Sequence, residues 1–180
     1  MNRPGGTMYK EASKVGVIMQ RVPLNNRWQP YQWRPLEIVN TNLLPEGGRR
    51  CLRQEDADTR WLFSSFDIKL FNSESEGYFL NISSPQPCWF VMWRMEELDG
   101  SEIAVPKSVT LSYNEAARLM DGGEQIDTLP ASNDIIELLT GFVGEHYRPE
   151  PKLKRKKPSF EGGAGVAKMA GMEGDVRGRR

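Results

Sequence analysis

The chain has 180 residues, 38% of them hydrophobic, and a formal net charge of zero. Its length suits one domain with one core, because a domain of about 150 residues buries roughly 70% of its unfolded surface. The apolar run Trp89–Trp93 is far shorter than the roughly 20 residues of a membrane-spanning helix, and the first residues contain no apolar signal region. We therefore expect a cytoplasmic protein without a membrane span.

The net charge of zero conceals a difference between the body of the chain and its C-terminal tail. From Arg148 onward, 10 Lys and Arg oppose 4 Asp and Glu, which gives +6, and the remaining 14 and 20 give −6. A block of like charge usually stays solvated and often serves as an interaction arm. We predict a flexible N-terminus over residues 1–13, a single β-rich domain with C-terminal helices over 14–148, and a disordered, basic, Gly-rich tail over 149–180.

The first half of the body shows the alternation that is typical of strands. The stretch Val15–Met19 predicts a half-buried strand, and Leu36–Val39 predicts a second one. The segment Leu43–Thr59 contains Pro, two Gly and many charged residues, so it is predicted to be a mobile loop.

The β pattern is strongest in the middle of the chain. The stretches Phe66–Leu70 and Tyr78–Ile82 alternate on either side of the polar segment Ser73–Gly77, which predicts a hairpin. The apolar stretch Cys88–Met95 predicts a central strand that is covered on both faces. A further strand, Ile103–Leu111, contains a proline and is therefore expected at an edge or a bulge.

The last third of the body changes to a helical period. Ser112 and Glu115 have the spacing of a capping box, and a double glycine from Gly122 ends the predicted helix. A second helix begins near Ser132, with apolar residues at i, i+3, i+4, i+7 and i+8 from Ile135. Strands first and helices last predict an α+β fold: an antiparallel β-sheet, with a barrel-like closure left open, followed by two C-terminal helices.

The residue inventory offers little for catalysis or metal binding. His146 is the only histidine, and a histidine at a helix end that bonds a last-turn carbonyl accounts for it. Together with Cys51 and Cys88 it supplies one ligand fewer than a closed zinc site needs. We therefore predict no catalytic residue, no metal site and no cofactor.

Two segments are candidates for binding a partner. Trp28, Tyr31, Trp33 and Arg34 combine large aromatic area with positive charge, which suits a protein interface or stacking on bases. A hairpin whose rings cover the end of a sheet is the alternative interpretation.

The second candidate is the basic run near the start of the tail. It contains five basic residues, Lys152, Lys154, Arg155, Lys156 and Lys157. Such a run attracts an acidic protein, a nucleic acid or an acidic membrane surface, and charge alone selects none of them.

Several motifs together resemble a known family. They are Val15–Arg21, Trp28–Pro35, Leu70-Phe71 with Glu74–Tyr78, Leu80–Ser83, Ser112–Ala117 with Asp121–Glu124, and His146–Pro151 before the basic run. From about Val15 to Lys157 the chain resembles the proteobacterial domain-of-unknown-function family numbered three thousand three hundred and five. That family has no established activity, so the resemblance implies no catalytic residue.

The resemblance does suggest a cellular context. Genes of the family are often found beside those of molybdenum-dependent formate dehydrogenases, their twin-Arg-exported subunits and a dedicated chaperone. We therefore expect a non-enzymatic accessory or interaction protein, with another protein as its partner, that assists assembly or maturation of such an enzyme. Two alternatives stay open: an enzyme or carrier in molybdenum-cofactor handling, and a nucleic-acid-binding module that uses the basic tail.

Overall fold

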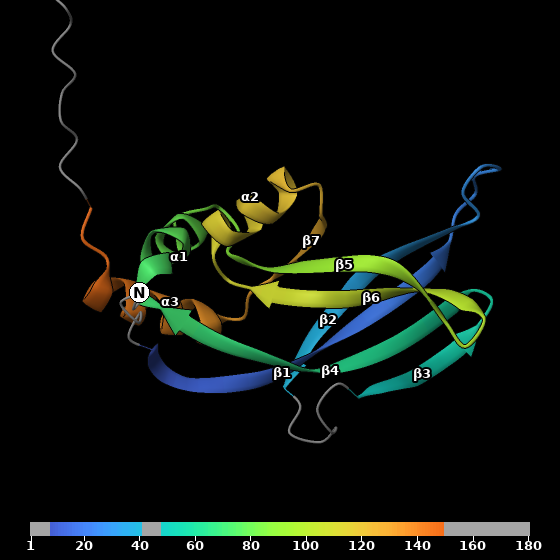
Figure 1. Ribbon diagram of the computed structural model, residues 1–180, viewed down its shortest axis with the longest axis horizontal. Coiled ribbons are helices and arrows are strands. Elements are labelled where there is room, and N and C mark those ends of the chain that lie inside the picture. Colours follow the sequence, from blue (N-terminus) through green and yellow to red (C-terminus); the bar gives the residue numbers. More distant parts are fainter. Residues whose placement is uncertain (1–7, 41–47, 150–180) are drawn as a thin grey trace, which may run out of the picture. The chain divides into compact units, whose positions relative to one another are not determined.

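The computed structural model describes residues 8–40 and 48–149, with side chains from Lys14 onward. Within these ranges the chain forms seven strands, three α-helices and one short 3-10 helix (Figure 1). The elements are β1 (Met8–Pro23), β2 (Tyr31–Asn40), β3 (Arg49–Glu55), β4 (Asp58–Phe71), η1 (Asn72–Glu74), α1 (Ser75–Ile82), β5 (Cys88–Leu98), β6 (Ser101–Thr110), α2 (Tyr113–Asp121), β7 (Gln125–Pro130) and α3 (Asn133–His146). No helix among these is long and apolar enough to cross a membrane.

The strands form two antiparallel sheets rather than one. The first sheet has the order β2-β1-β4-β3 and the second has the order β6-β5-β7. The predicted α+β fold with antiparallel strands is confirmed. The barrel-like closure is not found, because each sheet in the described part of the chain keeps two edge strands.

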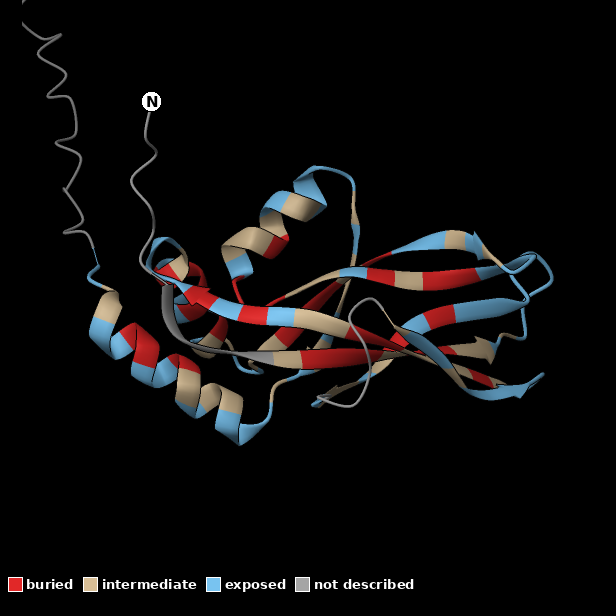
Figure 2. Ribbon diagram, turned by 60° about the horizontal axis from the view of Figure 1, so that its bottom comes forward, coloured by how far each residue is buried: buried red, intermediate tan, exposed pale blue. Residues whose placement is uncertain are grey.

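The apolar faces of the two sheets pack against each other. One buried cluster takes Val17 and Met19 from β1, Trp33 from β2, and Val91 and Trp93 from β5. Alternation explains this choice, because every second residue of a strand points to the same face, and Figure 2 shows buried positions alternating with more exposed ones along the strands. Removal of such a side chain from water contributes about 1.5–3 kcal/mol.

A second buried cluster continues the core under the helices. Val15 and Trp89 from the sheets pack with Tyr78 from α1 and with Leu139 and Phe142 from α3. The apolar face that the sequence predicts for α3 therefore packs on the sheets, as expected. The central position of β5 in its sheet, with Trp89, Phe90 and Val91 all buried in succession, also agrees with the prediction.

The predicted hairpin after residue 70 is wrong. The segment Ser75–Ile82 forms helix α1 instead of a polar turn and a strand. Tyr78 and Asn81 lie one helical turn apart and are 2% and 1% exposed, and the Tyr78 ring packs edge-on against Phe142 with ring centres 5.6 Å apart. In an eight-residue stretch, alternating apolar residues fit either period, so packing on α3 decides the structure.

The sequence pattern also misses two strands. β3 lies inside the segment predicted to be a mobile loop, and it pairs with β4 from Arg49 to Glu55. β7 lies between α2 and α3 and pairs with β5. Both are short edge strands with few buried residues, so they lack a clear apolar alternation.

The boundaries of the domain follow from the described elements. β1 begins at Met8, before the start that the sequence predicts at residue 14, and one compact unit extends to Arg148. The predicted tail over 149–180, with its basic run Lys152, Lys154, Arg155, Lys156 and Lys157, lies outside the described residues except for Pro149. The disorder and the binding role of the tail stay predictions.

Candidate functional site

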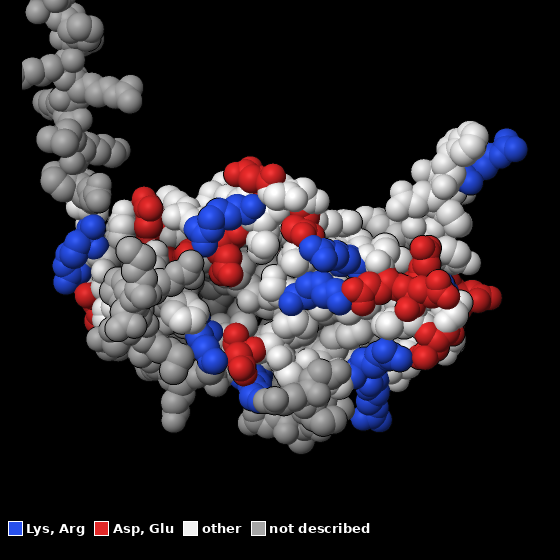
Figure 3. Space-filling model, in the orientation of Figure 1, with Lys and Arg blue, Asp and Glu red and all other residues white. Residues whose placement is uncertain are grey.

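The β1–β2 hairpin ends in a turn that projects from the rest of the domain (Figures 1 and 3). We call residues 22–32 the hairpin tip. Leu24 donates its N–H to the Pro30 carbonyl at 2.8 Å, and the Asn26 carboxamide accepts the N–H of Trp28 at 3.0 Å, so the turn has a defined shape. The Trp28 side chain is 89% exposed, and the Arg27 guanidinium lies 6.0 Å from its ring centre.

Tyr31 lies beside the same turn and is held by a cation. The Arg21 guanidinium lies 4.4 Å from the Tyr31 ring centre and also donates to Thr59 Oγ1 at 3.3 Å. Tyr31 is 41% exposed. Trp28 and Tyr31 therefore present two rings at one end of the hairpin, each next to an arginine.

The structure does not bring all four candidate residues to this surface. Trp33 is 9% exposed and belongs to the core between the sheets. Arg34 donates to Gln20 Oε1 at 3.2 Å, and Gln20 in turn donates to Asp58 Oδ1 at 2.9 Å, which forms a polar chain across the first sheet. The alternation of buried Trp33 with exposed Gln32 and Arg34 is the sequence signal for this division.

Asp58 is the last residue of that polar chain and its only carboxylate. Besides Gln20, it accepts hydrogen bonds from Arg60 and from Arg53, each at 3.0 Å. These bonds, that of Arg60 above all, lower the pKa of Asp58 to about 2 from an ordinary 3.8. The ionised carboxylate therefore stabilises the folded state at any pH above the ordinary pKa of 3.8. That stabilisation is lost as the pH falls from about 4 to 2.

We expect Asp58→Asn to flatten the acid dependence of stability. Urea-unfolding midpoints at pH 5, 4, 3 and 2 should fall less steeply for Asp58→Asn than for the wild type, because the variant has no carboxylate to protonate at this position. Asp56→Asn is the matched control, since Asp56 is exposed in the same turn and has no ion pair within the described residues. Equal slopes for the wild type and Asp58→Asn would contradict the prediction.

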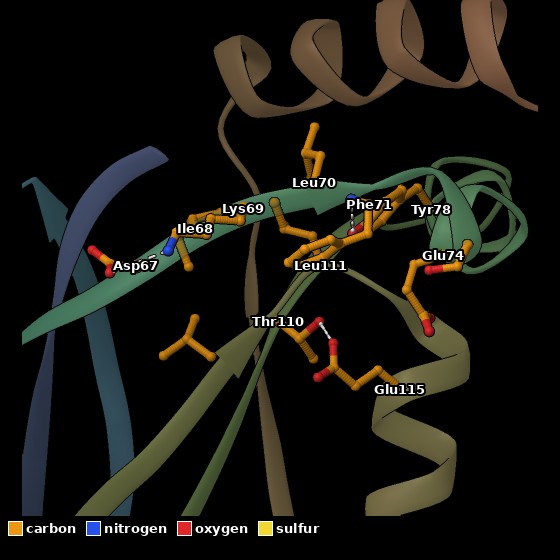
Figure 4. Close-up of a pocket in the computed structure, with 12 residues that line it drawn as sticks. Asp67, Ile68, Lys69, Leu70, Phe71, Glu74, Tyr78, Thr110, Leu111 and Glu115 are labelled. Atoms are coloured by element: carbon orange, nitrogen blue, oxygen red, sulfur yellow. Dashed lines mark hydrogen bonds and ion pairs between the residues drawn. The ribbon is translucent and has the colours of Figure 1, made fainter. Parts of the chain in front are cut away.

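A pocket of about 370 Å³ opens at another corner of the domain (Figure 4). We call it the corner pocket. Its lining comes from the end of β4, from η1 and α1, from the end of β6 and from α2. The lining residues are Asp67, Ile68, Lys69, Leu70, Phe71, Ser73, Glu74, Tyr78, Val109, Thr110, Leu111 and Glu115.

A polar network fixes the helix ends around the corner pocket. Ser112 caps α2 by accepting the N–H of Glu115 at 3.1 Å and donates its hydroxyl to Glu74 Oε2 at 2.6 Å. Arg118 donates to the other oxygen of Glu74 at 2.7 Å. Thr110 accepts the N–H of Ser112 at 3.1 Å and donates to Glu115 Oε2 at 2.5 Å. The predicted capping box is therefore present with the Thr110 hydroxyl inserted between its two ends.

Asn81 ties α1 to both strands that end near this corner. Its amide nitrogen donates to the carbonyls of Cys88 and Leu111, each at 2.8 Å, and its amide oxygen accepts the N–H of Cys88 at 3.0 Å. These bonds satisfy backbone groups where β5 begins and where β6 has ended. The geometry of the pocket is thus set by backbone contacts as well as by side chains.

Tyr78 of α1 places a phenol hydroxyl at the pocket. Its oxygen accepts the N–H of Phe71 at 3.3 Å. Burial, with a smaller contribution from the nearby Glu74 and Glu115 carboxylates, raises the pKa of Tyr78 to about 12. The hydroxyl is therefore protonated at neutral pH, and it lies in a negative local potential.

Among the described residues, the remaining His, Cys, Asp and Glu side chains form no metal site. Cys51 and Cys88 are unbridged, and burial raises the pKa of the Cys88 thiol. Over residues 8–40 and 48–149, no group of three or more His, Cys, Asp and Glu side chains is placed to hold a metal ion.

A comparison with protein families decides which family this chain represents. The model of the family described as "Protein of unknown function (DUF3305)" matches residues 14–156. The chain belongs to this family. No curated protein and no solved structure shows a significant match to it.

Three of the motifs that carry the family resemblance meet at the corner pocket. They are Leu70-Phe71 at the end of β4, Glu74–Tyr78 across η1 and α1, and Ser112–Ala117 at the start of α2. Sequence reasoning missed this site because it predicted a strand over Tyr78–Ile82. The hydrogen bond from Ser112 to Glu74 could not be predicted from the spacing of the two residues along the chain.

Proposed function

We propose that this protein is a cytoplasmic, non-enzymatic accessory protein that binds another protein through the hairpin tip. The observation that carries the proposal is Trp28, which is 89% exposed on a turn whose shape is fixed by its own hydrogen bonds. Large aromatic rings on a pre-organised turn lose little conformational entropy on binding and often supply most of the binding energy of an interface.

The chemistry of the hairpin tip specifies the kind of surface it fits. Arg21 and Arg27 lie against the two exposed rings, so the tip combines apolar area with positive charge. A partner with an apolar pocket and an acidic rim is complementary to it. The basic run over residues 152–157 would add long-range attraction to the same kind of partner.

The first candidate partner is a molybdenum-dependent formate dehydrogenase. This choice rests on the gene neighbourhood that the family resemblance suggests. The interaction through Trp28 does not depend on it, since the chemistry of the hairpin tip fits any partner surface of the stated kind.

We expect Trp28→Ala to weaken partner binding by about tenfold or more, chiefly through faster dissociation, because it removes the central ring of the interface. Partners captured from a native extract, with and without nuclease treatment, would be identified by mass spectrometry, and purified formate dehydrogenase subunits would be tested directly. Association and dissociation rates would then be measured with the purified partner.

Leu52→Ala is the matched control for this experiment. Leu52 is 45% exposed on β3, away from the hairpin tip, so its truncation removes a similar exposed apolar side chain without touching the proposed interface. A partner that dissociates from Trp28→Ala no faster than from the wild type would contradict the proposal. Capture that depends on nucleic acid in the extract would favour the nucleic-acid-binding alternative instead.

A further inference from the structure

The walls of the corner pocket are the edges of two strands. Five consecutive residues of β4, Asp67–Phe71, line it, and so do Val109 and Thr110 at the end of β6 and Leu111 directly after it. A strand face would contribute only every second residue, so consecutive lining residues show that the pocket runs along the strand edges.

Neither edge is paired with a further strand in the part of the chain that the structure describes. β3 pairs with β4 only as far as Phe63. From Asp67 to Phe71, β4 pairs with β1 along one edge, and no described strand pairs with its other edge. β6 is an edge strand that pairs with β5. Open edges of this kind accept an extended peptide, which adds main-chain hydrogen bonds to the sheet.

The charges around the pocket favour a cation. Asp67, Glu74 and Glu115 line it, against a single basic lining residue, Lys69, whose ammonium lies 3.8 Å from Asp67. Both oxygens of Glu74 are occupied, by Ser112 and Arg118. Glu115 differs, because Oε2 accepts from Thr110 while Oε1 has no hydrogen-bond partner among the described residues.

The Tyr78 hydroxyl supplies a second, independent indication of a ligand. Tyr78 is 2% exposed and lines the pocket, and its oxygen accepts the N–H of Phe71. The hydroxyl proton itself has no acceptor in the described part of the chain. A buried donor without an acceptor is unfavourable, and a main-chain carbonyl of a bound peptide would satisfy it.

We propose that the corner pocket binds an Arg or Lys residue within an extended segment of a partner protein. The cationic group lies at Oε1 of Glu115, a carbonyl of the segment accepts from Tyr78, and the flanking backbone lies along the edges of β4 and β6. The volume of about 370 Å³ is near the lower limit of the roughly 300–1,000 Å³ of ligand pockets, which suits one side chain with its backbone. This site shares no residue with the hairpin tip, so its test does not depend on the proposed function.

The test is a titration of the full chain with a terminally blocked peptide, Thr-Val-Arg-Val-Thr, followed by two-dimensional NMR. We expect shifts centred on the residues that line the corner pocket. The same peptide with Gln in place of Arg should bind about tenfold or more weakly, because it cannot form the charge-assisted hydrogen bonds. Arginine amide alone should also bind more weakly, because it has no flanking backbone to pair with the strand edges.

Three variants separate the proposed contacts. Glu115→Gln should weaken binding of the Arg peptide severalfold, and Tyr78→Phe should weaken both peptides alike. Asp67→Asn alters a carboxylate that is already paired with Lys69 at the other end of the pocket, so it should change binding little. Glu137→Gln on the exposed side of α3 is the control for the loss of one negative charge. Tyr78 takes no part in the capping network, so Tyr78→Phe decides the question if Glu115→Gln fails to fold.

Four outcomes would overturn the proposal. Three of them are no binding of the Arg peptide at millimolar concentration, equal binding of that peptide to Tyr78→Phe and the wild type, and shifts that map away from the pocket, for example to the acidic residues Glu96, Glu97, Asp99 and Glu102 of the β5–β6 hairpin. Arginine amide that binds as tightly as the peptide would also overturn it, since the pocket would then be a site for a small cation and not for an extended segment.

Discussion

Trp33→Ala is expected to lower the free energy of unfolding by about 3–5 kcal/mol, as measured by urea denaturation. The Trp33 ring is 9% exposed and packs between the two sheets with Val17, Trp93 and Ile103. Truncation to Ala leaves a cavity between two sheets that are held by their own hydrogen bonds, so the surrounding side chains can refill only part of it.

Trp28→Ala is the natural comparison, because it makes the same chemical change five residues away on the exposed hairpin tip. Trp28 is 89% exposed, so its loss should change the free energy of unfolding by less than about 0.5 kcal/mol. Similar unfolding midpoints for the two variants would show that Trp33 is not part of the core, and the assignment of roles within the aromatic cluster would fail.

The sequence predicts the parts of this fold that depend on local pattern. Alternation at Val15, Val17 and Met19 identifies the buried face of β1, and all three are at most 3% exposed. The helical period from Ile135 identifies the packed face of α3. Ser112 identifies the start of α2 because a cap is a contact between residues three apart.

The parts that could not be predicted depend on contacts between distant residues. Tyr78 and Leu80 alternate as they would in a strand, but α1 forms because Tyr78 packs on Phe142, which lies 64 positions later in the chain (142 − 78). β7 has little pattern of its own and is defined by pairing with β5. Local sequence therefore determines whether a face is apolar, and the tertiary partner determines the final element.

The candidate sites divide in the same way. Exposure of Trp28 could be expected from its place between Asn26 and Pro30, both turn-forming residues. The corner pocket could not be predicted from the sequence, because it forms only where the end of β4, the start of α1 and the start of α2 come together. The motifs of the family mark these segments, but only the structure shows that Glu74, Ser112 and Glu115 belong to one network.

The same network makes a glycine of α1 sensitive to substitution. A Cβ at Gly77 would lie 2.1 Å from Ser112 Oγ and 3.2 Å from the backbone nitrogen of Asn114. Ser112 is fully buried and its hydroxyl is engaged by Glu74 and by the Glu115 N–H, so it cannot move without breaking the cap of α2. Overpacking costs about 1–3 kcal/mol and a lost cap about 0.5–2 kcal/mol.

We therefore expect Gly77→Ala to destabilise the protein by about 2–3 kcal/mol in urea denaturation, even though alanine is favoured over glycine in a helix by about 1 kcal/mol. Gly141→Ala is the matched control, because a Cβ at Gly141 in α3 has nothing within 4 Å, and it should stabilise by about 0.5–1 kcal/mol. The double variant Gly77→Ala/Ser112→Gly removes the overlap with the Ser112 side chain and should be more stable than Gly77→Ala alone, since glycine at an N-cap costs only a few tenths of a kcal/mol relative to serine. An unfolding midpoint for Gly77→Ala at or above that of the wild type would mean that α1 and α2 can separate without cost, and the close contact between them would have no energetic role.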